Sequence, residues 1–454
     1  MKPARSFWKK ARLVLLFLVI IGVAIQFIRP RLDNPPVTGD LQAPEEVKVI
    51  LQRACYDCHS NQTKLAWFDL PAPAYWLVVD DVKKGRKVLN FSDIGNLPKA
   101  QQAAKLFESI YQVEQNAMPL KSYTALHHGG KISPEEVDIL KKYVGTLAYT
   151  PKPDTARQRQ QLDQYAAWMK FLPAAAQAMP EHNGIGYADL AGFSNWGAVS
   201  TTERYDNGTM RVILGNDVAV KAVREGHTNP WPDGAVFAKV AWDQLPDSAG
   251  EIHTGVYKQV EFMIRDAKKY DTSFGWGFAR WVGGLALKPY GKDVSFVTEC
   301  MNCHKPMGYN NYTFTIPVAD TIGLYDQAVA ALPDPLASHP LTGKVITSFV
   351  NTRDGTMSTL YGNDIAVKSA RAGQVYPAGA VVSLVTWSQR DDPHWFGGRI
   401  PKALHSIEML SYDSAAAPAY VYYEGETRVK KAMAPLEMQA RAKYITAQRA
   451  SVMP

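Results

Sequence analysis

The sequence predicts a multidomain α+β chain with an apolar N-terminal helix, an all-α domain, and two tandem β-rich domains, each an antiparallel sheet with short helices. Three observations lead to this prediction. An apolar run lies near the amino terminus, helical periodicity covers residues 40–147, and strand-like alternation with Pro and Gly turns occurs twice after residue 190. The chain of 454 residues is long enough for about three domains.

Residues 13–28 (LVLLFLVIIGVAIQFI) form the apolar run, and the residues before it carry several positive charges: Lys2, Arg5, Lys9, Lys10 and Arg12. This pattern predicts that residues 1–30 are a cytoplasmic basic flank and a signal-anchor helix, with the rest of the chain exported. A cleaved signal peptide is the alternative, although no small-x-small site follows the run. The net charge of +7 is spread along the chain, so no nucleic-acid partner is predicted.

Residues 40–147 are predicted to be helical. Val47, Ile50, Leu51 and Ala54 share one face of a first helix, and Ser133-Pro134-Glu135-Glu136 has the capping pattern that begins a last one. A helical spacer is expected over residues 148–190, with a helix from Thr155 to Gln177.

The remainder contains an internal repeat, which predicts one β-rich domain over residues 191–320, a second over 340–425 and a tail over 426–454. Each copy should run from a strand through a short helix to a Pro-x-Gly turn and another strand. Three stretches recur in order: 208–226 as 355–373, 232–242 as 377–387, and 260–263 as 407–410.

All four cysteines lie in two identical frames, Cys55-Tyr-Asp-Cys58-His59 and Cys300-Met-Asn-Cys303-His304. Cys-x-x-Cys-His is the signal for attachment of a c-type haem, in which two thiols bind the vinyl groups and the histidine binds iron. Zinc or a pair of redox disulfides would also use Cys-x-x-Cys, but neither explains the histidine after both pairs. We therefore predict two covalently bound c-type haems.

One lysine stands out in the first repeat. Ala235, Phe237, Lys239 and Ala241 alternate onto one strand face, where a lysine is costly unless it is paired, reaches solvent or is chemically used. The second repeat, which has no cysteine, carries Leu384 at the matching position. Lysine and haem signal are absent together, which favours a role for Lys239 at the haem; the alternative is a lysine that extends from an edge strand to solvent.

The first repeat resembles the cytochrome P-460 family, which includes the cytochromes c′-β. The resemblance covers about 130 residues and lies in the motifs 232–234, Lys239, 261–270, 276–278 and 300–304. It implies a β-rich domain, usually homodimeric, with one haem that has a histidine as its single strong ligand. In the hydroxylamine-oxidising members a lysine is bonded to the haem, and Lys239 lies where that lysine is expected. The second repeat resembles a degenerate member without the haem motif.

Residues 40–147 resemble the small haem-binding domain of exported bacterial proteins, through Cys55–Asn61, Gly85-Arg86, 89–92 and Met118-Pro119. This resemblance implies a cytochrome c-like electron-transfer domain. His59 is the expected proximal ligand of its iron. Met118 is the first candidate for the sixth ligand, with His127 and His128 as alternatives.

The expected function follows from the vacant coordination site at the second haem, where His304 is the proximal ligand. The resemblance implies oxidation of hydroxylamine to nitrous oxide, with Glu261 as the candidate proton acceptor and Arg211 as a polar contact on the distal side. A solvated strand position is the alternative for Glu261, because the haemless repeat has Glu408 there. Electrons would leave through the first haem to a soluble cytochrome or a quinone-linked chain.

Two other functions remain open: binding of nitric oxide or carbon monoxide without turnover, and electron transfer alone. The predicted location is the bacterial periplasm, with the N-terminal helix in the inner membrane. A tandem haemless copy could replace the second subunit of a homodimer and make the chain an internal pseudo-dimer. The remaining histidines have no partner at ligand spacing and are predicted to be structural or exposed: His182, His227, His253, His339, His394 and His405.

Overall fold

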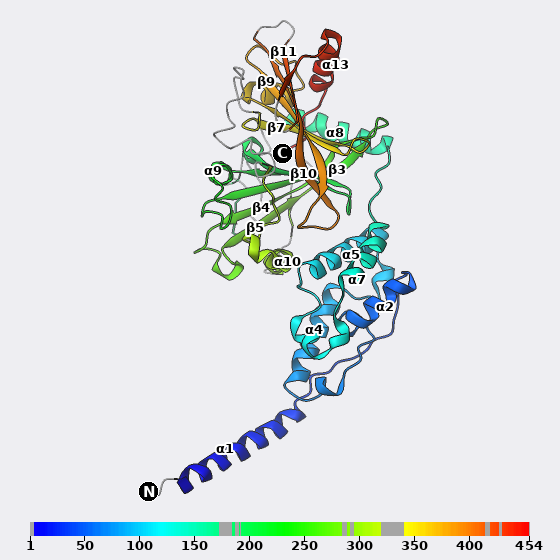
Figure 1. The fold of residues 1–454 in the computed structure, drawn as a ribbon, viewed down its shortest axis with the longest axis vertical. Helices are drawn as coiled ribbons and strands as arrows, with labels where there is room; N and C mark the ends of the chain where they lie inside the picture. The colour runs from blue at the N-terminus through cyan, green and yellow to red at the C-terminus, as the bar shows by residue number, and fades with distance from the viewer. Residues whose placement is uncertain are drawn as a thin grey trace. The chain divides into compact units, whose positions relative to one another are not determined.

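The computed structural model describes residues 4–171, 184–186, 190, 192–283, 288–290, 295–318, 340–413, 418–425 and 429–453. Over these residues the chain forms two compact units, Met1–Leu147 and Ala148–Pro454 (Figure 1). The first unit is helical and the second is rich in antiparallel strands. The predicted fold class is therefore confirmed for both parts of the chain.

The first unit begins with α1 (Ala4–Ala24), followed by the short 3₁₀ turn η1 (Ile25–Phe27). The helix starts before the apolar run, so it is longer than the run alone predicts. Its stretch Lys10–Phe27 is apolar enough and long enough to cross a membrane, and none of it is buried by the protein. A helix of this kind near the amino terminus suits a membrane anchor or a signal sequence.

The helical unit packs around a core that includes Val47, Ile50, Phe91, Phe107 and Leu140. The apolar face predicted for the first helix is buried as expected. The helices of this unit are α2 (Glu45–Ala54), α3 (Tyr56–His59), α4 (Ala74–Val88), α5 (Lys99–Glu114), α6 (Lys121–Leu126) and α7 (Pro134–Gly145). Three 3₁₀ turns join them: η2 (Trp67–Asp69), η3 (Ile94–Asn96) and η4 (His128–Gly130).

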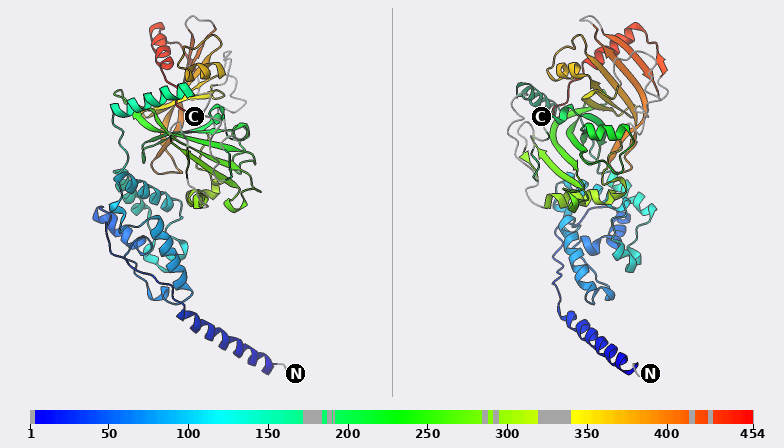
Figure 2. Two further views of the ribbon diagram at one scale, coloured as in Figure 1. Left: turned by 180° about the vertical axis from the view of Figure 1, so that it is seen from behind. Right: turned by 90° about the vertical axis from the view of Figure 1, so that its left-hand side faces the viewer.

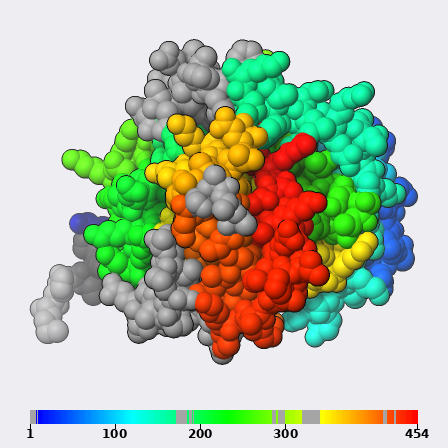
Figure 3. All heavy atoms as spheres, turned by 90° about the horizontal axis from the view of Figure 1, so that it is seen from above, coloured from blue at the N-terminus to red at the C-terminus, as the bar shows by residue number. Residues whose placement is uncertain are grey.

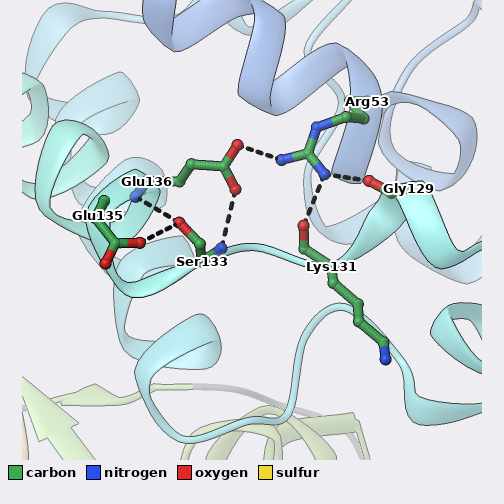
Figure 4. Close-up of polar contacts among 6 residues, drawn as sticks. All are labelled: Arg53, Gly129, Lys131, Ser133, Glu135 and Glu136. Atoms are coloured by element: carbon green, nitrogen blue, oxygen red, sulfur yellow. Dashed lines mark hydrogen bonds and ion pairs between the residues drawn. The ribbon is translucent and has the colours of Figure 1, made fainter.

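Arg53 ties the helix before the first haem signal to the last helix (Figure 4). Its guanidinium donates to Glu136 Oε1 at 2.5 Å and to the Lys131 carbonyl at 2.7 Å, and it also contacts the Gly129 carbonyl. Glu136 is at the same time the capping-box residue of α7, because its Oε2 accepts from the Ser133 amide at 2.9 Å. The capping pattern read from the sequence thus also fixes α2.

The second unit contains two successive sets of elements in the same order. The first set is β1 (Gly197–Arg204), β2 (Thr209–Gly215), α9 (Asp217–Arg224), β3 (Val236–Pro246), β4 (Glu251–Arg265), β5 (Trp276–Val282) and β6 (Lys288–Pro289). The second set is β7 (Lys344–Asn351), β8 (Thr356–Gly362), α12 (Asp364–Arg371), β9 (Val381–Asp391), β10 (Gly398–Ser411), β11 (Ala419–Glu424) and β12 (Val429–Lys431). Asn216 and Asn363 cap the two short helices in the same way, by accepting from the amides of Ala219 and Ala366.

The described strands form a 12-stranded sheet, β12-β11-β10-β9-β8-β7-β1-β2-β3-β4-β5-β6, that curls into a barrel-like shape (Figure 2). Two further pairings, β1 with β10 and β4 with β7, are reciprocal between the repeats. Strands β1–β4 are therefore closed into a ring by β7, and β7–β10 are closed by β1. The expectation of two tandem domains is not confirmed in that form, because the repeats make one compact unit.

Strand β3 separates two hydrophobic cores, because its alternate residues point to opposite sides of the sheet. Val240 and Trp242 point to a large core that both repeats share. Phe237 points the other way, into a smaller cluster with Trp231, Trp276 and Phe278. Cys300 packs against that smaller cluster, so the second haem signal lies on the same side of the sheet as Lys239.

The segments expected to be a spacer and a tail both belong to this fold. Helix α8 (Thr155–Phe171) buries Trp168 in the shared core, and its Gln164 accepts from the Tyr257 amide at 2.8 Å. At the other end, α13 (Pro435–Thr446) is followed by residues whose Val452 carbonyl accepts from Trp242 Nε1 at 2.7 Å. Figure 3 shows this C-terminal segment (red) against the strands of the second repeat (orange).

Candidate functional site

The first haem signal lies at the junction of α2 and α3. The thiols of Cys55 and Cys58 are free, and burial raises their pKa values to about 12 and about 11. A redox-active Cys-x-x-Cys needs the opposite, a thiolate stabilised by nearby positive charge. The surroundings of this pair therefore disfavour the disulfide alternative.

His59, the last residue of the signal, has one ring nitrogen fixed. Its Nδ1 donates to the Leu89 carbonyl at 3.1 Å, so Nε2 carries the lone pair. Burial also lowers the pKa of His59, which keeps the ring neutral. Gly85 of α4 allows this close approach, because a Cβ there would lie 2.8 Å from the Cys58 carbonyl oxygen and 3.3 Å from His59 Cε1. A neutral imidazole with a free Nε2 suits an axial ligand of haem iron.

A polar network connects the first signal to His127. Asp57, inside the signal, accepts from the Tyr123 hydroxyl at 2.8 Å, and the Tyr123 ring stacks on His127 at 4.0 Å between centroids. His127 Nδ1 lies 3.2 Å from the Tyr123 carbonyl, and Nε2 lies 3.0 Å from Asp69. Both nitrogens of His127 thus have protein partners, while Met118 and His128 remain candidates for the sixth ligand.

The second signal lies at the end of α10 (Ser295–His304), and η9 (Lys305–Asn310) follows it. His304 repeats the arrangement of His59: its Nδ1 donates to the Tyr312 carbonyl at 2.7 Å, which leaves Nε2 with the lone pair. Burial lowers the pKa of His304 to about 4. The rings of Phe278 and Phe314 lie against the imidazole, at 5.3 and 4.9 Å between centroids.

The turn that presents the Tyr312 carbonyl is held by buried tryptophans. Asn311 and Tyr312 have left-handed φ values of 46° and 62°, which are strained conformations for residues with a side chain. Trp276 Nε1 donates to the Asn311 carbonyl at 3.0 Å, and the Asn311 side chain accepts from the Trp231 amide at 3.0 Å. These contacts stabilise the turn and hence the orientation of His304.

Charged side chains form a row across three strands on the same side of the sheet. Lys239 on β3 lies opposite Glu261 on β4, which lies opposite Arg280 on β5. Lys239 and Glu261 form an ion pair, and Arg280 Nη1 lies 3.9 Å from Glu261 Oε1. Arg280 also reaches Glu299, the residue before Cys300, at 3.8 Å. The row therefore extends from Lys239 to the second haem signal.

The charges in this row shift one another's pKa values. Burial raises the pKa of Glu261, but the positive charges of Lys239, Arg211 and Arg280 outweigh it, and the net pKa falls to about 2. Burial, and the nearby charge of Arg211, lower the pKa of Lys239 and outweigh the attraction of Glu261. Burial lowers the pKa of Arg211 to about 10. Arg211 lies on β2, two pairs along the ladder from Lys239, and its Nε donates to the Thr209 hydroxyl at 3.2 Å.

The haemless repeat replaces this row with a different interaction. Leu384 lies opposite Glu408, as Lys239 lies opposite Glu261, and both of the second-repeat residues are buried. Arg441 of α13 binds the Glu408 carboxylate through two hydrogen bonds of 2.6 and 2.9 Å, and Tyr420 donates to it at 2.5 Å. Glu408 is thus an internal ion-pair partner, which removes it as evidence that Glu261 is a solvated position.

Sequence reasoning missed several residues of the second site. Arg280 and Tyr312 have no motif of their own, and only the strand register and the turn after η9 bring them to the signal. His394, which was expected to be structural or exposed, has its Nδ1 2.7 Å from the Phe314 carbonyl, which is a structural contact. Strand alternation could have identified Arg280, since it faces the same side as Lys239 once the register is known.

Two Cys-x-x-Cys-His frames, one in a helical unit and one against a β-sheet, each with a histidine whose Nδ1 donates to a backbone carbonyl, define a haem-binding cytochrome. Comparison with family models agrees: the model of the haem-binding domain matches residues 20–146. The model of cytochrome P460 matches residues 190–315 and 342–436, so the second stretch covers the haemless repeat. The chain is a fusion of a haem-binding domain with a cytochrome P460 domain. A comparison with curated proteins finds no match.

Proposed function

We propose that the chain is a dihaem c-type cytochrome that oxidises hydroxylamine, or a related small nitrogen compound, at its second haem. Cys55 and Cys58 would hold the first haem and Cys300 and Cys303 the second, with His59 and His304 as axial ligands. The observation that carries this proposal is the row of Lys239, Glu261 and Arg280, which reaches the second signal through Glu299. The matching positions of the haemless repeat hold Leu384, Glu408 and Tyr422.

A haem at Cys300 and Cys303 would supply an iron that binds a small nitrogen compound and accepts single electrons. Conversion of hydroxylamine to nitrous oxide releases protons and electrons in equal number, so a proton acceptor is needed. Glu261 is the proposed acceptor, because its carboxylate lies on the side of the sheet against which Cys300 packs. Arg211 would supply a polar contact to the bound compound.

Lys239 would bond to the ring of the second haem and fix its position. Its side chain is partly buried, and burial and the charge of Arg211 lower its pKa. Glu261, the residue opposite, would then orient the nitrogen through the contact that is present here as an ion pair.

The N-terminal haem-binding domain would pass the electrons to a cytochrome or to a quinone-linked acceptor. Met118 is its proposed sixth ligand, and His127 would instead support the signal through Tyr123 and Asp57. The apolar α1 supports a periplasmic location with an anchor in the inner membrane. The reciprocal pairing of β1 with β10 and β4 with β7 supports an internal pseudo-dimer.

A second candidate function is the binding of nitric oxide or carbon monoxide without turnover. The Lys239–Glu261 ion pair favours it, because a protonated lysine held by a carboxylate is not a nucleophile. In that case Lys239 would stay unbonded and would present its charge to the bound gas.

The test is a single-turnover experiment on the purified full-length chain. Hydroxylamine is added to the oxidised protein, both haems are followed by their optical spectra, and the gas phase is analysed for nitrous oxide. Reduction of the second haem and then of the first, with nitrous oxide formed, is the expected result. Binding of nitric oxide without any reduction by hydroxylamine would favour the second candidate, and a first haem that never reduces would reject the relay.

A further inference from the structure

The loop between β9 and β10 of the haemless repeat, residues 392–397, lies against the first repeat. The loop leads into β10, which begins beside β1: Gly398 pairs with Arg204 and Arg399 pairs with Glu203. The Gly397 carbonyl accepts from the Asp206 amide at 3.2 Å, and the Asp392 side chain accepts from the His394 amide at 2.8 Å. The loop is thus attached to β1 by backbone hydrogen bonds and is folded by its own aspartate.

Trp395 of this loop is held by a buried ion pair of the first repeat. Its ring lies under the Arg204 guanidinium, at 4.3 Å from the ring centroid, and its Nε1 donates to Asp206 at 3.2 Å. Arg204 and Asp206 are both almost fully buried and bind each other through two hydrogen bonds. A cation over an indole face and a charge-assisted hydrogen bond together fix the plane of the ring.

The same loop contacts the segment that follows the second haem signal. His394 Nδ1 lies 2.7 Å from the Phe314 carbonyl and therefore donates to it, since a carbonyl can only accept. The Phe314 ring packs edge-on against Trp395 at 5.8 Å and against His304 at 4.9 Å between centroids. Phe314 is thus held between a ring of the haemless repeat and the proposed axial ligand.

We propose that the haemless repeat supplies His394 and Trp395 as positioning residues, which hold Phe314 against the His304 ring and so set the orientation of that imidazole. The inference rests on the proposed attachment of a haem at Cys300 and Cys303. Two contacts of His304 come from its own repeat, the Tyr312 carbonyl at Nδ1 and the Phe278 ring, and a third comes from Phe314, which the other repeat holds.

The corresponding hairpin of the first repeat, between β3 and β4, is shorter and has no counterpart of His394 or Trp395, which supports this assignment. Between β3 and β4 only residues 247–250 intervene, and they lie beside β7, where Thr352 donates to the Gly250 carbonyl at 2.8 Å. The haemless repeat has no Cys-x-x-Cys-His signal, so it has no proposed axial histidine that this hairpin could position. The longer loop with His394 and Trp395 thus occurs in the copy whose neighbour carries the haem signal.

The test uses the full-length protein with His394→Leu, which removes the donor, and His394→Asn, whose Nδ2 can replace Nδ1. The iron–histidine stretching band of the reduced protein reports the orientation and hydrogen bonding of the axial imidazole, and the reduction potential is measured for each haem. His394→Leu should keep both haems by mass, but broaden and shift the band and shift the potential of the second haem. The asparagine variant should restore both readouts.

Trp395→Phe provides a milder variant if the leucine variant does not fold, since it keeps a ring and loses the bond to Asp206; a smaller shift of the same band is expected. His405→Asn, an exposed histidine on β10, is the matched control and should change nothing. The proposal is overturned if the leucine and asparagine variants behave alike, if Trp395→Phe leaves the band unchanged, or if both haems shift equally. A wild-type chain without haem at Cys300 would reject the proposed function as well, whereas a haem-loaded chain inactive with hydroxylamine would reject only the function.

Discussion

Lys239 and Glu261 lie directly opposite each other on β3 and β4 and form an ion pair at the face of the sheet that carries Cys300. The same ladder position in the second repeat pairs Leu384 with Glu408. One repeat thus keeps a lysine and a carboxylate in contact beside a haem signal, while the other buries its carboxylate against an arginine from the C-terminal helix.

Replacing Lys239 with leucine copies the haemless repeat into the first one. If Lys239 is bonded to the haem, the variant should lose the strong red shift of the reduced Soret band and show an ordinary c-type spectrum. Lys258→Leu is the control, because Lys258 on β4 forms an ion pair with Asp243 at 3.0 Å and lies outside the row. A wild-type spectrum that is already ordinary would contradict the bond.

Replacing Glu261 with glutamine removes the proposed proton acceptor but keeps its size. Hydroxylamine turnover should fall by roughly a hundredfold, the low end of what general base catalysis contributes, while both haems remain attached. Steady-state oxidation with an artificial electron acceptor measures this. Glu225→Gln, an exposed glutamate after α9, should keep full activity. An equal loss in both variants would argue against a role for Glu261.

The depressed pKa of Glu261 predicts how stability depends on pH. Its pKa is about 2 in the folded chain against a reference value of 4.5, so its ionised form stabilises the fold. That contribution is complete above pH 4.5 and is lost as the pH falls toward 2. Urea unfolding at several pH values should show a gap between wild type and Glu261→Gln that closes over this range. A gap that widens on acidification would contradict the sign.

Because Glu408 is buried, removing its partner Arg441 should lower the free energy of unfolding without changing the binding of either haem. Arg441→Leu removes the two hydrogen bonds to a carboxylate that is 3% exposed, and the loss of a buried charge partner costs about 3 kcal/mol. Urea unfolding should show this loss for Arg441→Leu and almost none for Lys443→Leu, an exposed position on the same helix. Normal spectra for both haems are expected in each case.

The sixth ligand of the first haem can be tested by a pair of variants. Met118→Leu should leave that iron with a vacant site, so carbon monoxide should bind to it after reduction. His127→Leu should keep the site closed, because both nitrogens of His127 already have protein partners. Binding of carbon monoxide to the His127 variant alone would reverse this assignment.

Much of this architecture could be predicted from the sequence because its signals are local. The capping box at Ser133 and Glu136, the Asn caps of the two short helices and the alternation on β3 all act within a few residues. The recurrence of the same motifs also indicated two copies. The sharing of β1 and β7 between the rings was not predictable, since pairing between strand residues that are 96 to 196 positions apart leaves no local pattern.

The site could be predicted only where a motif carried it. The cysteines and histidines of both signals stand out because of their spacing, and Lys239 because its face is otherwise apolar. Arg280 and Tyr312 are brought to the site by register and by a strained turn, and His394 by a loop of the other repeat. None of these three lies within a motif, and alternation along β5 indicates Arg280 only once the strand register is known.

Because β1 and β7 each belong to both rings, the two repeats depend on each other for their fold. A homodimer paired in this way would dissociate on dilution. Both subunits of such a homodimer would also need the same interface residues, because the interface is symmetric. Within one polypeptide the halves meet at a fixed high local concentration, whatever the abundance of the protein. The two repeats therefore need not have the same sequence. The second repeat lacks the haem signal, and its loop 392–397 contacts the first repeat instead.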